Sequence, residues 1–92
     1  MIQSIKHKAL RNYWTNGQTK GLDAKLVAKL RRILLALDDA SAPEDMNIPS
    51  WKFHMLSGDR TGTYSIRLTG NWRVTFQWNG KDATFIDIED YH

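Results

Sequence analysis

Alternation of apolar and polar side chains is clearest in residues 64–78, YSIRLTGNWRVTFQW. A period of two residues is typical of β-strands with one buried face. Gly70 and Asn71 interrupt the alternation, and both residue types favour turns. The stretch therefore predicts two antiparallel strands that share one apolar face. The apolar positions are Tyr64, Ile66, Leu68, Trp72, Val74, Phe76 and Trp78.

Two loop lengths are possible between these strands, and only one keeps their faces consistent. A two-residue loop at 70–71 would oppose Leu68 to Arg73. A three-residue loop at 69–71 opposes Leu68 to Trp72. We favour the longer loop, because a slip of one residue moves every side chain to the wrong face of the sheet.

The favoured register places Arg67 directly across from Arg73. Like charges opposite one another destabilise a strand pair. Two interpretations stay open. The guanidiniums hold an anion between them, or they turn to solvent or to acids such as Asp87 and Glu89.

Further strands are expected on both sides of this pair. Residues 51–56 alternate, with His54 on the polar side. The dipeptide Asn79-Gly80 is the strongest local signal for a two-residue β-hairpin turn. Residues 81–88 then form the last strand.

The expected hairpin also makes a prediction for the last four residues, 89–92 (EDYH). It places Asp90 and His92 on the Arg73 side of the sheet and Tyr91 on the other side. Continued pairing with the strand that begins at Trp72 would by then have run into the loop at 69–71. Residues 89–92 are therefore expected to extend beyond the strand with which they form the hairpin.

The N-terminal half has a helical period instead. Residues 1–5 are a strand candidate, residues 6–16 form a first helix, and Gly17 ends that helix. Asp23 is expected to cap a second helix. Residues 38–50 are a polar connection. The apolar stripe of the second helix comprises Leu26, Val27, Leu30, Ile33, Leu34 and Leu37.

These elements predict an α+β fold, in which two N-terminal helices pack on one face of a small, mostly antiparallel, twisted β-sheet. A chain of 92 residues has room for one core, so residues 1–92 are expected to form a single domain. The absence of Cys excludes disulfides and a thiolate nucleophile. With no apolar run of about 20 residues and no signal-peptide pattern, we expect a cytoplasmic protein with no membrane partner.

Positive charge gathers in the first 37 residues, which hold eight Lys and Arg against Asp23 alone. Lys25, Lys29 and Arg32 line one side of the second helix. A basic surface on a small protein favours a polyanionic partner. The alternative is an ordinary solvated helix face.

The polar side of the sheet carries groups suited to acid–base chemistry on a phosphate. Imidazoles that titrate near neutrality, a carboxylate and guanidiniums can cleave RNA through its own 2′-hydroxyl, without a metal. The residues expected there are His54, Arg67, Arg73, Asp90 and His92, with Tyr91 adjacent.

Each of these residues also has an interpretation without catalysis. His54 fits a surface residue, Asp90 can pair with a Lys, and Tyr91 can belong to the core. A metal site at His54, Asp90 and His92 is a further alternative, although the spacing matches no common zinc signature.

Specific motifs extend over the whole chain. They are G-D-R-x-G in 58–62, S-I-R in 65–67, N-W-R-V-T-F in 71–76, the final D-Y-H, and the opening MIQSIKHKALR. In this order and spacing they resemble the HigB toxins of HigBA toxin–antitoxin systems, within the RelE-like group.

The resemblance implies an endoribonuclease that enters the A site of the 70S ribosome and cuts messenger RNA by 2′-hydroxyl attack, with no metal or cofactor. The implied catalytic positions are His54, Arg73, Asp90, Tyr91 and His92. Arg60 is implied as an RNA or ribosome contact. Ser57 departs from the basic residue that many relatives carry there.

The implied partner is a HigA-type helix-turn-helix antitoxin, through which operator DNA would be bound only indirectly. The alternative is a catalytically inactive module that binds RNA, the ribosome or the antitoxin and acts as a transcriptional co-repressor. The presence of His54, Arg73 and the final D-Y-H favours the enzyme.

Overall fold

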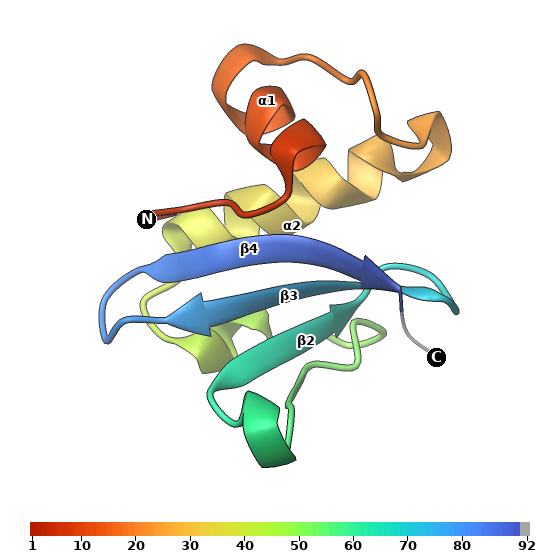
Figure 1. Cartoon of the computed structure of the whole chain (residues 1–92). Coiled ribbons are helices and arrows are strands. Elements are labelled where there is room, and N and C mark those ends of the chain that lie inside the picture. The colour runs from red at the N-terminus through yellow and green to blue at the C-terminus, as the bar shows by residue number, and fades with distance from the viewer. Residues whose placement is uncertain (91–92) are drawn as a thin grey trace.

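The computed structural model, which describes residues 1–90, places two α-helices on one face of an antiparallel sheet (Figure 1). The sheet order within these residues is β1-β2-β3-β4. Short 3₁₀ turns at Ala24–Leu26, Pro43–Met46 and Gly58–Arg60 connect the elements. The expected α+β fold is confirmed. The bounds are α1 Lys8–Asn16, α2 Val27–Asp39, β1 His54–Met55, β2 Thr63–Arg67, β3 Trp72–Trp78 and β4 Ala83–Asp90.

The register between β2 and β3 is the one that the alternation predicts. Ile66 pairs with Val74, and Arg67 pairs with Arg73. The N–H of Leu68 donates to the carbonyl oxygen of Trp72 at 2.9 Å. The three-residue loop is therefore confirmed, and the two arginines do lie across from each other.

The prediction of a two-residue turn at Asn79-Gly80 is wrong. Trp78 pairs with Ala83, so the loop holds four residues. The Oδ1 of Asn79 accepts hydrogen bonds from the backbone N–H groups of Lys81 at 2.9 Å and Asp82 at 2.7 Å. This side-chain-capped turn replaces the tight hairpin, because Asn can bond the backbone two residues on.

A β-bulge then changes the face on which the rest of β4 lies. Gln77 pairs with Thr84, but Thr75 pairs with Asp87, so β4 contains one extra residue. A two-residue turn would have opposed Arg73 to Ile86. That arrangement would set Ile86 on the polar face, whereas it is fully buried against the helices. Burial of this apolar side chain favours the bulge.

The bulge corrects two expectations about the C-terminal residues. Arg73 pairs with Glu89, and Trp72 pairs with Asp90. By register, Glu89 and not Asp90 shares the side of Arg73. Residues 89 and 90 remain paired with β3 and do not extend beyond it. The predictions for Tyr91 and His92 lie outside the described residues.

The strand expected over residues 51–56 is shorter, because β1 contains His54 and Met55 only. Ser50 and Lys52 have φ angles of 75° and 49°, in the left-handed region, which interrupts regular strand pairing. Trp51 is buried in the core, and its carbonyl oxygen accepts from the N–H of Arg67 at 2.7 Å.

The prediction for the end of the first helix is confirmed, whereas the prediction that Asp23 caps the second helix is wrong, because α2 has Leu26 at its N-cap and no side-chain cap. Gly17 adopts φ 73° after α1, and its N–H donates to the carbonyl oxygen of Tyr13. Asp23 caps the 3₁₀ turn that leads into α2, with Oδ1 accepting from the N–H of Lys25 at 2.9 Å. The strand candidate at residues 1–5 lies parallel to β4, through single bridges of Ile2 to Ala83 and Ile5 to Ile86.

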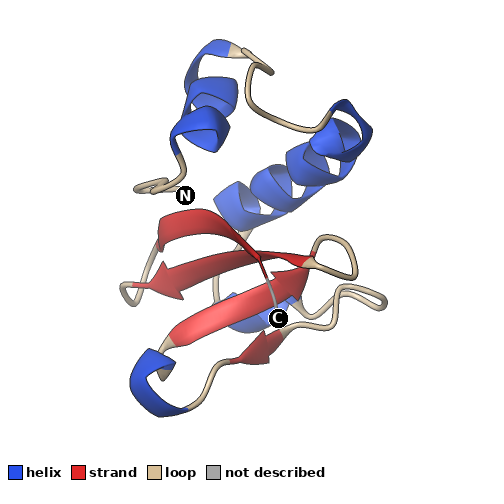
Figure 2. Cartoon of the chain, turned by 45° about the vertical axis from the view of Figure 1, so that its right-hand side comes forward, coloured by secondary structure: helices blue, strands red, loops and turns tan. Residues whose placement is uncertain are grey.

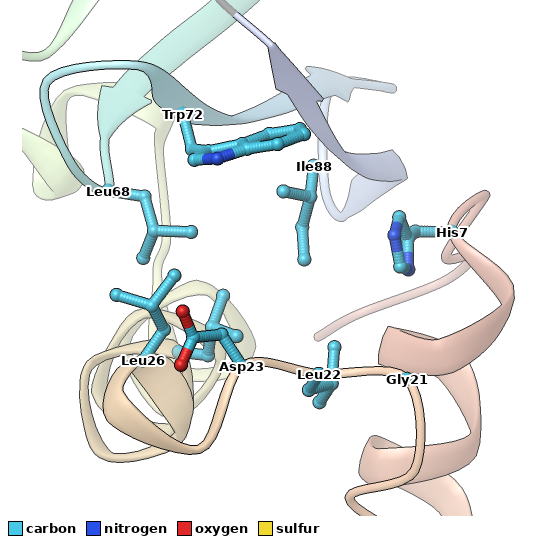
Figure 3. Close-up of a pocket in the computed structure, with 9 residues that line it drawn as sticks. His7, Gly21, Leu22, Asp23, Leu26, Leu68, Trp72 and Ile88 are labelled. Atoms are coloured by element: carbon cyan, nitrogen blue, oxygen red, sulfur yellow. The ribbon is translucent and has the colours of Figure 1, made fainter.

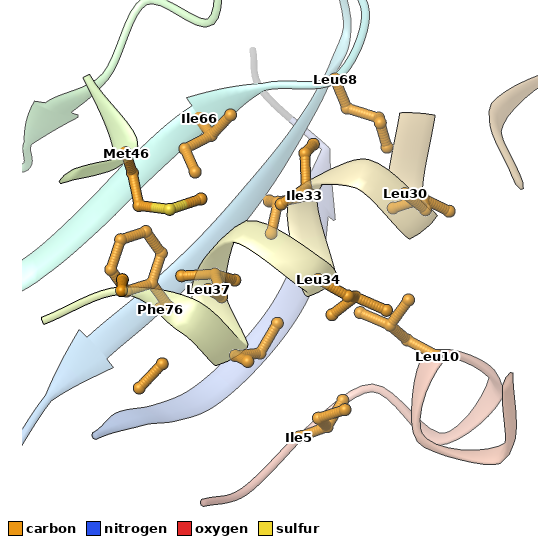
Figure 4. Close-up of a cluster of buried hydrophobic side chains, with 14 of the residues drawn as sticks. Ile5, Leu10, Leu30, Ile33, Leu34, Leu37, Met46, Ile66, Leu68 and Phe76 are labelled. Carbon is orange, nitrogen blue, oxygen red and sulfur yellow. The ribbon is translucent and has the colours of Figure 1, made fainter. Parts of the chain in front are cut away.

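The core lies between α2 and one face of the sheet (Figure 4). Burial of each large apolar side chain in this core contributes about 1.5–3 kcal/mol to the stability of the fold. Because both α-helices take the same face (Figure 2), the polar side chains are left on the other, which we call the open face. No helix within residues 1–90 has the length and apolar character needed to span a membrane. The fully buried residues of this core include Leu30, Ile33, Leu34 and Leu37 of α2 and Ile66, Val74 and Phe76 of the sheet.

Candidate active site

Two rows of polar side chains cross the open face of the sheet. One row runs through His54, Ser65, Thr75 and Asp87, which pair in turn from β1 to β4. The other runs through Arg67, Arg73 and Glu89. Directly paired residues of antiparallel strands share a face. The rows therefore gather an imidazole, hydroxyls, guanidiniums and carboxylates on one surface.

A hollow of about 220 Å³ opens between these rows, and we call it the first hollow. It brings together three residues proposed from the sequence: Arg60, Arg73 and Asp90. His54 is one strand away, opposite Ser65, and Arg67 does not line the hollow. The lining residues are Leu56, Arg60, Ser65, Arg73, Thr75, Glu89 and Asp90.

Arg60 and Glu89 form the wall of the first hollow. Both terminal nitrogens of Arg60 donate to the carboxylate of Glu89, each at 2.7 Å. The hydroxyl of Thr75 donates to the same carboxylate. The hydrogen bond from Arg60 holds the pKa of Glu89 below its ordinary value, although burial acts against it. The hydrogen bond to Glu89 raises the pKa of Arg60 in turn.

Glu89 is a site residue that the sequence interpretation considered only as a possible partner for the arginines. Its position depends on the bulge in β4, which the alternation of β4 does not reveal. The structure also sets an acid beside the facing guanidiniums, since Glu89 is the β4 neighbour of Arg73. The like-charge pair therefore has an opposite charge next to it.

Ser65 is the second residue that the sequence reasoning missed. Its side chain is 1% exposed, and its Oγ has no hydrogen-bond partner within residues 1–90. It lines the first hollow together with Arg73, whose Nε and Nη1 atoms are also shielded from solvent. A buried hydroxyl without a partner costs about 1–3 kcal/mol. An oxygen-rich ligand in the hollow would give it one. Ser65 stands at a polar position between two apolar residues in the sequence, and this alternation is the signal that could have identified it.

Arg67 extends toward the loop between β2 and β3, where its Nη2 would lie 3.9 Å from a Cβ at Gly70. The Nζ of Lys29 donates to the carbonyl oxygen of Leu68 at 3.1 Å. Burial lowers the pKa of Lys29, and the charges of Arg67 and Arg32 lower it further. Arg67 therefore belongs to the same positive region as two of the basic residues of α2.

His54 is exposed, and its ring has one nitrogen directed to the backbone. Nδ1 lies 3.0 Å from the carbonyl oxygen of Lys52. A proton on Nδ1 satisfies this contact and leaves Nε2 as the acceptor. The geometry therefore prepares Nε2 for proton transfer.

A separate apolar groove of about 280 Å³ lies on the helical side (Figure 3). Trp72 of β3 and Ile88 of β4 form one wall, and Leu22 and Leu26 lie opposite. None of the site residues expected from the sequence lines this groove. Residues 1–90 contain no group of three His, Asp or Glu side chains placed to hold a metal ion.

Comparison with solved structures supports the fold. The chain is similar to the YoeB dimer from Staphylococcus aureus, with a TM-score of 0.60 and 21% identity, covering 100% of this chain and 99% of the other. It is similar to YafQ from E. coli strain BL21(DE3), with a TM-score of 0.57 and 13% identity, covering 98% and 93%.

Sequence comparison gives the family. The model of the RelE-like toxin of type II toxin–antitoxin system HigB matches residues 3–92. The chain is 41% identical to Endoribonuclease HigB of Proteus vulgaris over 92 residues, covering 100% of both. It is 32% identical to Toxin HigB-1 of Vibrio cholerae serotype O1 over 95 residues, covering 99% of this chain and 100% of the relative. The chain belongs to the HigB family of RelE-like toxins of type II toxin–antitoxin systems.

Proposed function

We propose that this chain is an endoribonuclease that cuts messenger RNA in the A site of the ribosome. The observation that carries the proposal is the first hollow, where Arg73 and Ser65 lie on the same face as His54 and Asp90 contributes to the lining. Full-length similarity to an endoribonuclease supports the same reaction class.

The proposed reaction uses the nucleophile that RNA carries. A base removes the proton of the 2′-hydroxyl, the oxygen attacks the adjacent phosphate, and an acid protonates the leaving 5′-oxygen. Arg73 holds the phosphate and stabilises its developing charge, a term that is often the largest in catalysis. His92 and His54 transfer the protons, and each such group is typically worth 10²–10⁴-fold in rate. These steps need no metal.

The remaining site residues have supporting roles in the proposal. Asp90 orients an imidazole or polarises it, and Tyr91 stacks on a substrate base. Ser65 adds a hydroxyl to the phosphate contacts. Both terminal nitrogens of Arg60 are engaged by Glu89, so Arg60 shapes the wall of the first hollow before any contact with RNA.

A type II toxin has an antitoxin partner. We propose that this partner is a HigA-type helix-turn-helix protein that carries the contact to operator DNA. Lys25, Lys29 and Arg32 are proposed to contact ribosomal RNA phosphates. Lys29 has a structural role as well, because it holds the carbonyl oxygen of Leu68.

Cleavage mapping in a translating extract tests the proposal. Wild type is expected to cut a defined message only when ribosomes are present. Arg73→Ala and His54→Ala are each expected to lower the cutting rate by about 100-fold or more. Lys81→Ala, in the exposed turn before β4, is the matched control and should cut as wild type does.

The outcome separates the enzyme from an inactive binding module. An inactive co-repressor would bind antitoxin and leave the message intact at any toxin concentration. Full activity in Arg73→Ala, with the fold verified by thermal unfolding, would remove the first hollow from the reaction.

A further inference from the structure

A second hollow, of about 250 Å³, lies beside the first on the open face of the sheet. The two share the wall formed by Arg60, Thr75 and Glu89. Thr75 lines both, and Gln77, two residues further along β3, lines only the second. Two strand residues span roughly 7 Å. The two hollows are therefore consecutive positions along one surface.

The bulge in β4 turns Phe85 into this second hollow. Phe85 and Ile86 together lie opposite Phe76, since Gln77 pairs with Thr84 and Thr75 with Asp87. Ile86 enters the core, whereas Phe85 is 55% exposed and lines the hollow. A bulge is a known means of redirecting one side chain next to an active site.

Phe85 keeps this position at a conformational cost. Its φ is 50°, in the left-handed region that a bulky residue rarely adopts. The N-terminal segment holds both sides of the residue: the N–H of Phe85 donates to Ser4 Oγ at 2.8 Å, and the N–H of Lys6 donates to the carbonyl oxygen of Ile86 at 2.7 Å. Strain of this kind persists where the surroundings enforce it, often at binding sites.

The other groups around the second hollow suit one part of a nucleotide each. The ring of Phe85 offers a stacking face, Gln77 offers an amide that both donates and accepts, and Lys6 offers a positive charge. Lys6 also contributes to the low pKa of Glu89, which places its charge near the shared wall. Single-stranded RNA is recognised by this combination of stacking, edge hydrogen bonds and cations.

We propose that the second hollow binds the base of a nucleotide next to the scissile linkage, with Phe85 stacked on the base and Gln77 at its edge. The inference rests on the proposed function and extends it from one phosphate to the neighbouring nucleotide. A strand crossing the sheet then places its scissile phosphate in the first hollow and the flanking base in the second.

Purified toxin acting on ribosomes that carry a short defined message provides the test. Phe85→Asn removes the ring, and Asn tolerates a left-handed φ better than most residues. Phe85→Tyr keeps the ring. The Asn variant is expected to cut about 5- to 150-fold more slowly, the loss of one base–aromatic stack. The Tyr variant should stay close to wild type. Leu35→Asn removes an exposed apolar side chain from α2 and is the control.

Messages with an abasic ribose on one side or the other of the scissile linkage identify the stacked base. At one of the two positions, the missing base is expected to slow wild type by the same factor as Phe85→Asn. It should slow the Asn variant no further, because the stack is already lost. Fully additive effects at both positions would overturn the inference.

The two proposals fail in distinguishable ways. If wild type cuts and Phe85→Asn cuts equally fast, this inference fails and the proposed function stands. If wild type cuts no message, both fail. If Phe85→Asn weakens antitoxin binding in calorimetry while its cutting rate is unchanged, the ring serves the antitoxin and the inference is overturned.

Discussion

At the scale of single residues, Glu89 links the fold to the candidate site. Its carboxylate accepts two hydrogen bonds from Arg60 and one from Thr75, so its pKa lies below the ordinary value. Charge-assisted bidentate pairs of this kind fix geometry more strongly than they stabilise a fold. The pair therefore sets the shape of the wall between the two hollows.

Glu89→Gln is expected to lower the free energy of unfolding by about 1 kcal/mol at pH 7, because Arg60 and Thr75 lose their charged acceptor. A carboxyl whose pKa is depressed in the folded state stabilises the fold above its unfolded pKa, about 4.3 for Glu. That stabilisation disappears as the pH falls through the lower folded value. Urea unfolding should therefore show a gap between variant and wild type at pH 7 that narrows as the pH is lowered below about 4.3.

The matched control is Glu44→Gln, at an exposed acid in the 3₁₀ turn Pro43–Met46. It should show little difference from wild type at either pH. A gap for Glu89→Gln that is equally large at pH 7 and pH 3 would contradict the role given to its charge.

At the scale of the elements, the bulge in β4 decides which side chains face the open side. Before it, β4 follows the hairpin from Asn79. After it, Glu89 lies beside Arg73, and Ile86 is in the core. The cost of the bulge falls on Phe85, the residue with a positive φ.

The left-handed backbone conformation of Phe85 is expected to reverse the order of stability that Ala and Gly variants usually show in a strand. In a regular strand Ala is more stable than Gly, by roughly 0.5–1 kcal/mol. At Phe85 the left-handed φ favours Gly, so Phe85→Gly should exceed Phe85→Ala in unfolding free energy by about 1 kcal/mol. Urea unfolding measures both variants.

Gln77 provides the comparison, because it is an exposed residue of β3 whose φ is not positive. There Gln77→Ala should be more stable than Gln77→Gly. The same order at both positions would mean that Phe85 does not hold a left-handed conformation in solution.

At the scale of the whole molecule, one face of the sheet forms the core with the helices and the other face carries the candidate site. α2 buries its apolar stripe on one face of the sheet, which leaves the open face for polar groups. Lys25, in the 3₁₀ turn before α2, and Arg32 of α2 are both exposed. These two side chains therefore take no part in the core, whereas Lys29 is partly buried and bonds the carbonyl oxygen of Leu68.

Reversing Lys25 and Arg32 together to Glu is expected to weaken ribosome binding and to reduce its dependence on salt. Each lost phosphate contact lowers the slope of log affinity against log salt by about 0.7–0.9. Two lost contacts should therefore change the slope by roughly 1.4–1.8. Sedimentation with ribosomes at several salt concentrations measures both quantities.

Lys81→Glu together with Lys52→Glu reverses the same number of charges elsewhere on the surface. This pair should leave the salt slope close to that of wild type. Equal losses from both double variants would attribute the effect to net charge and remove Lys25 and Arg32 as contacts.

The sequence by itself determined the features that depend on neighbouring residues. Alternation within 64–78 was enough for the register of β2 and β3 and for the facing pair Arg67 and Arg73. Gly17 marked the end of α1, and Asp23 marked the start of the 3₁₀ turn before α2, because their preferences are local. Motifs along the whole length were enough to recognise the family, which the comparisons confirm.

Only the tertiary structure decided what faces Arg73. Local turn preference favoured a two-residue hairpin at Asn79-Gly80, whereas the observed four-residue loop moves the register by two residues and the bulge moves it by one more. Only the bulge changes the face on which Ile86 lies, and burial of Ile86 in the core favours it. The bulge that satisfies Ile86 brings Glu89 beside Arg73 and turns Phe85 outward. Burial sums contacts from α2, the N-terminal segment and the sheet at once, so no short stretch of sequence contains that information.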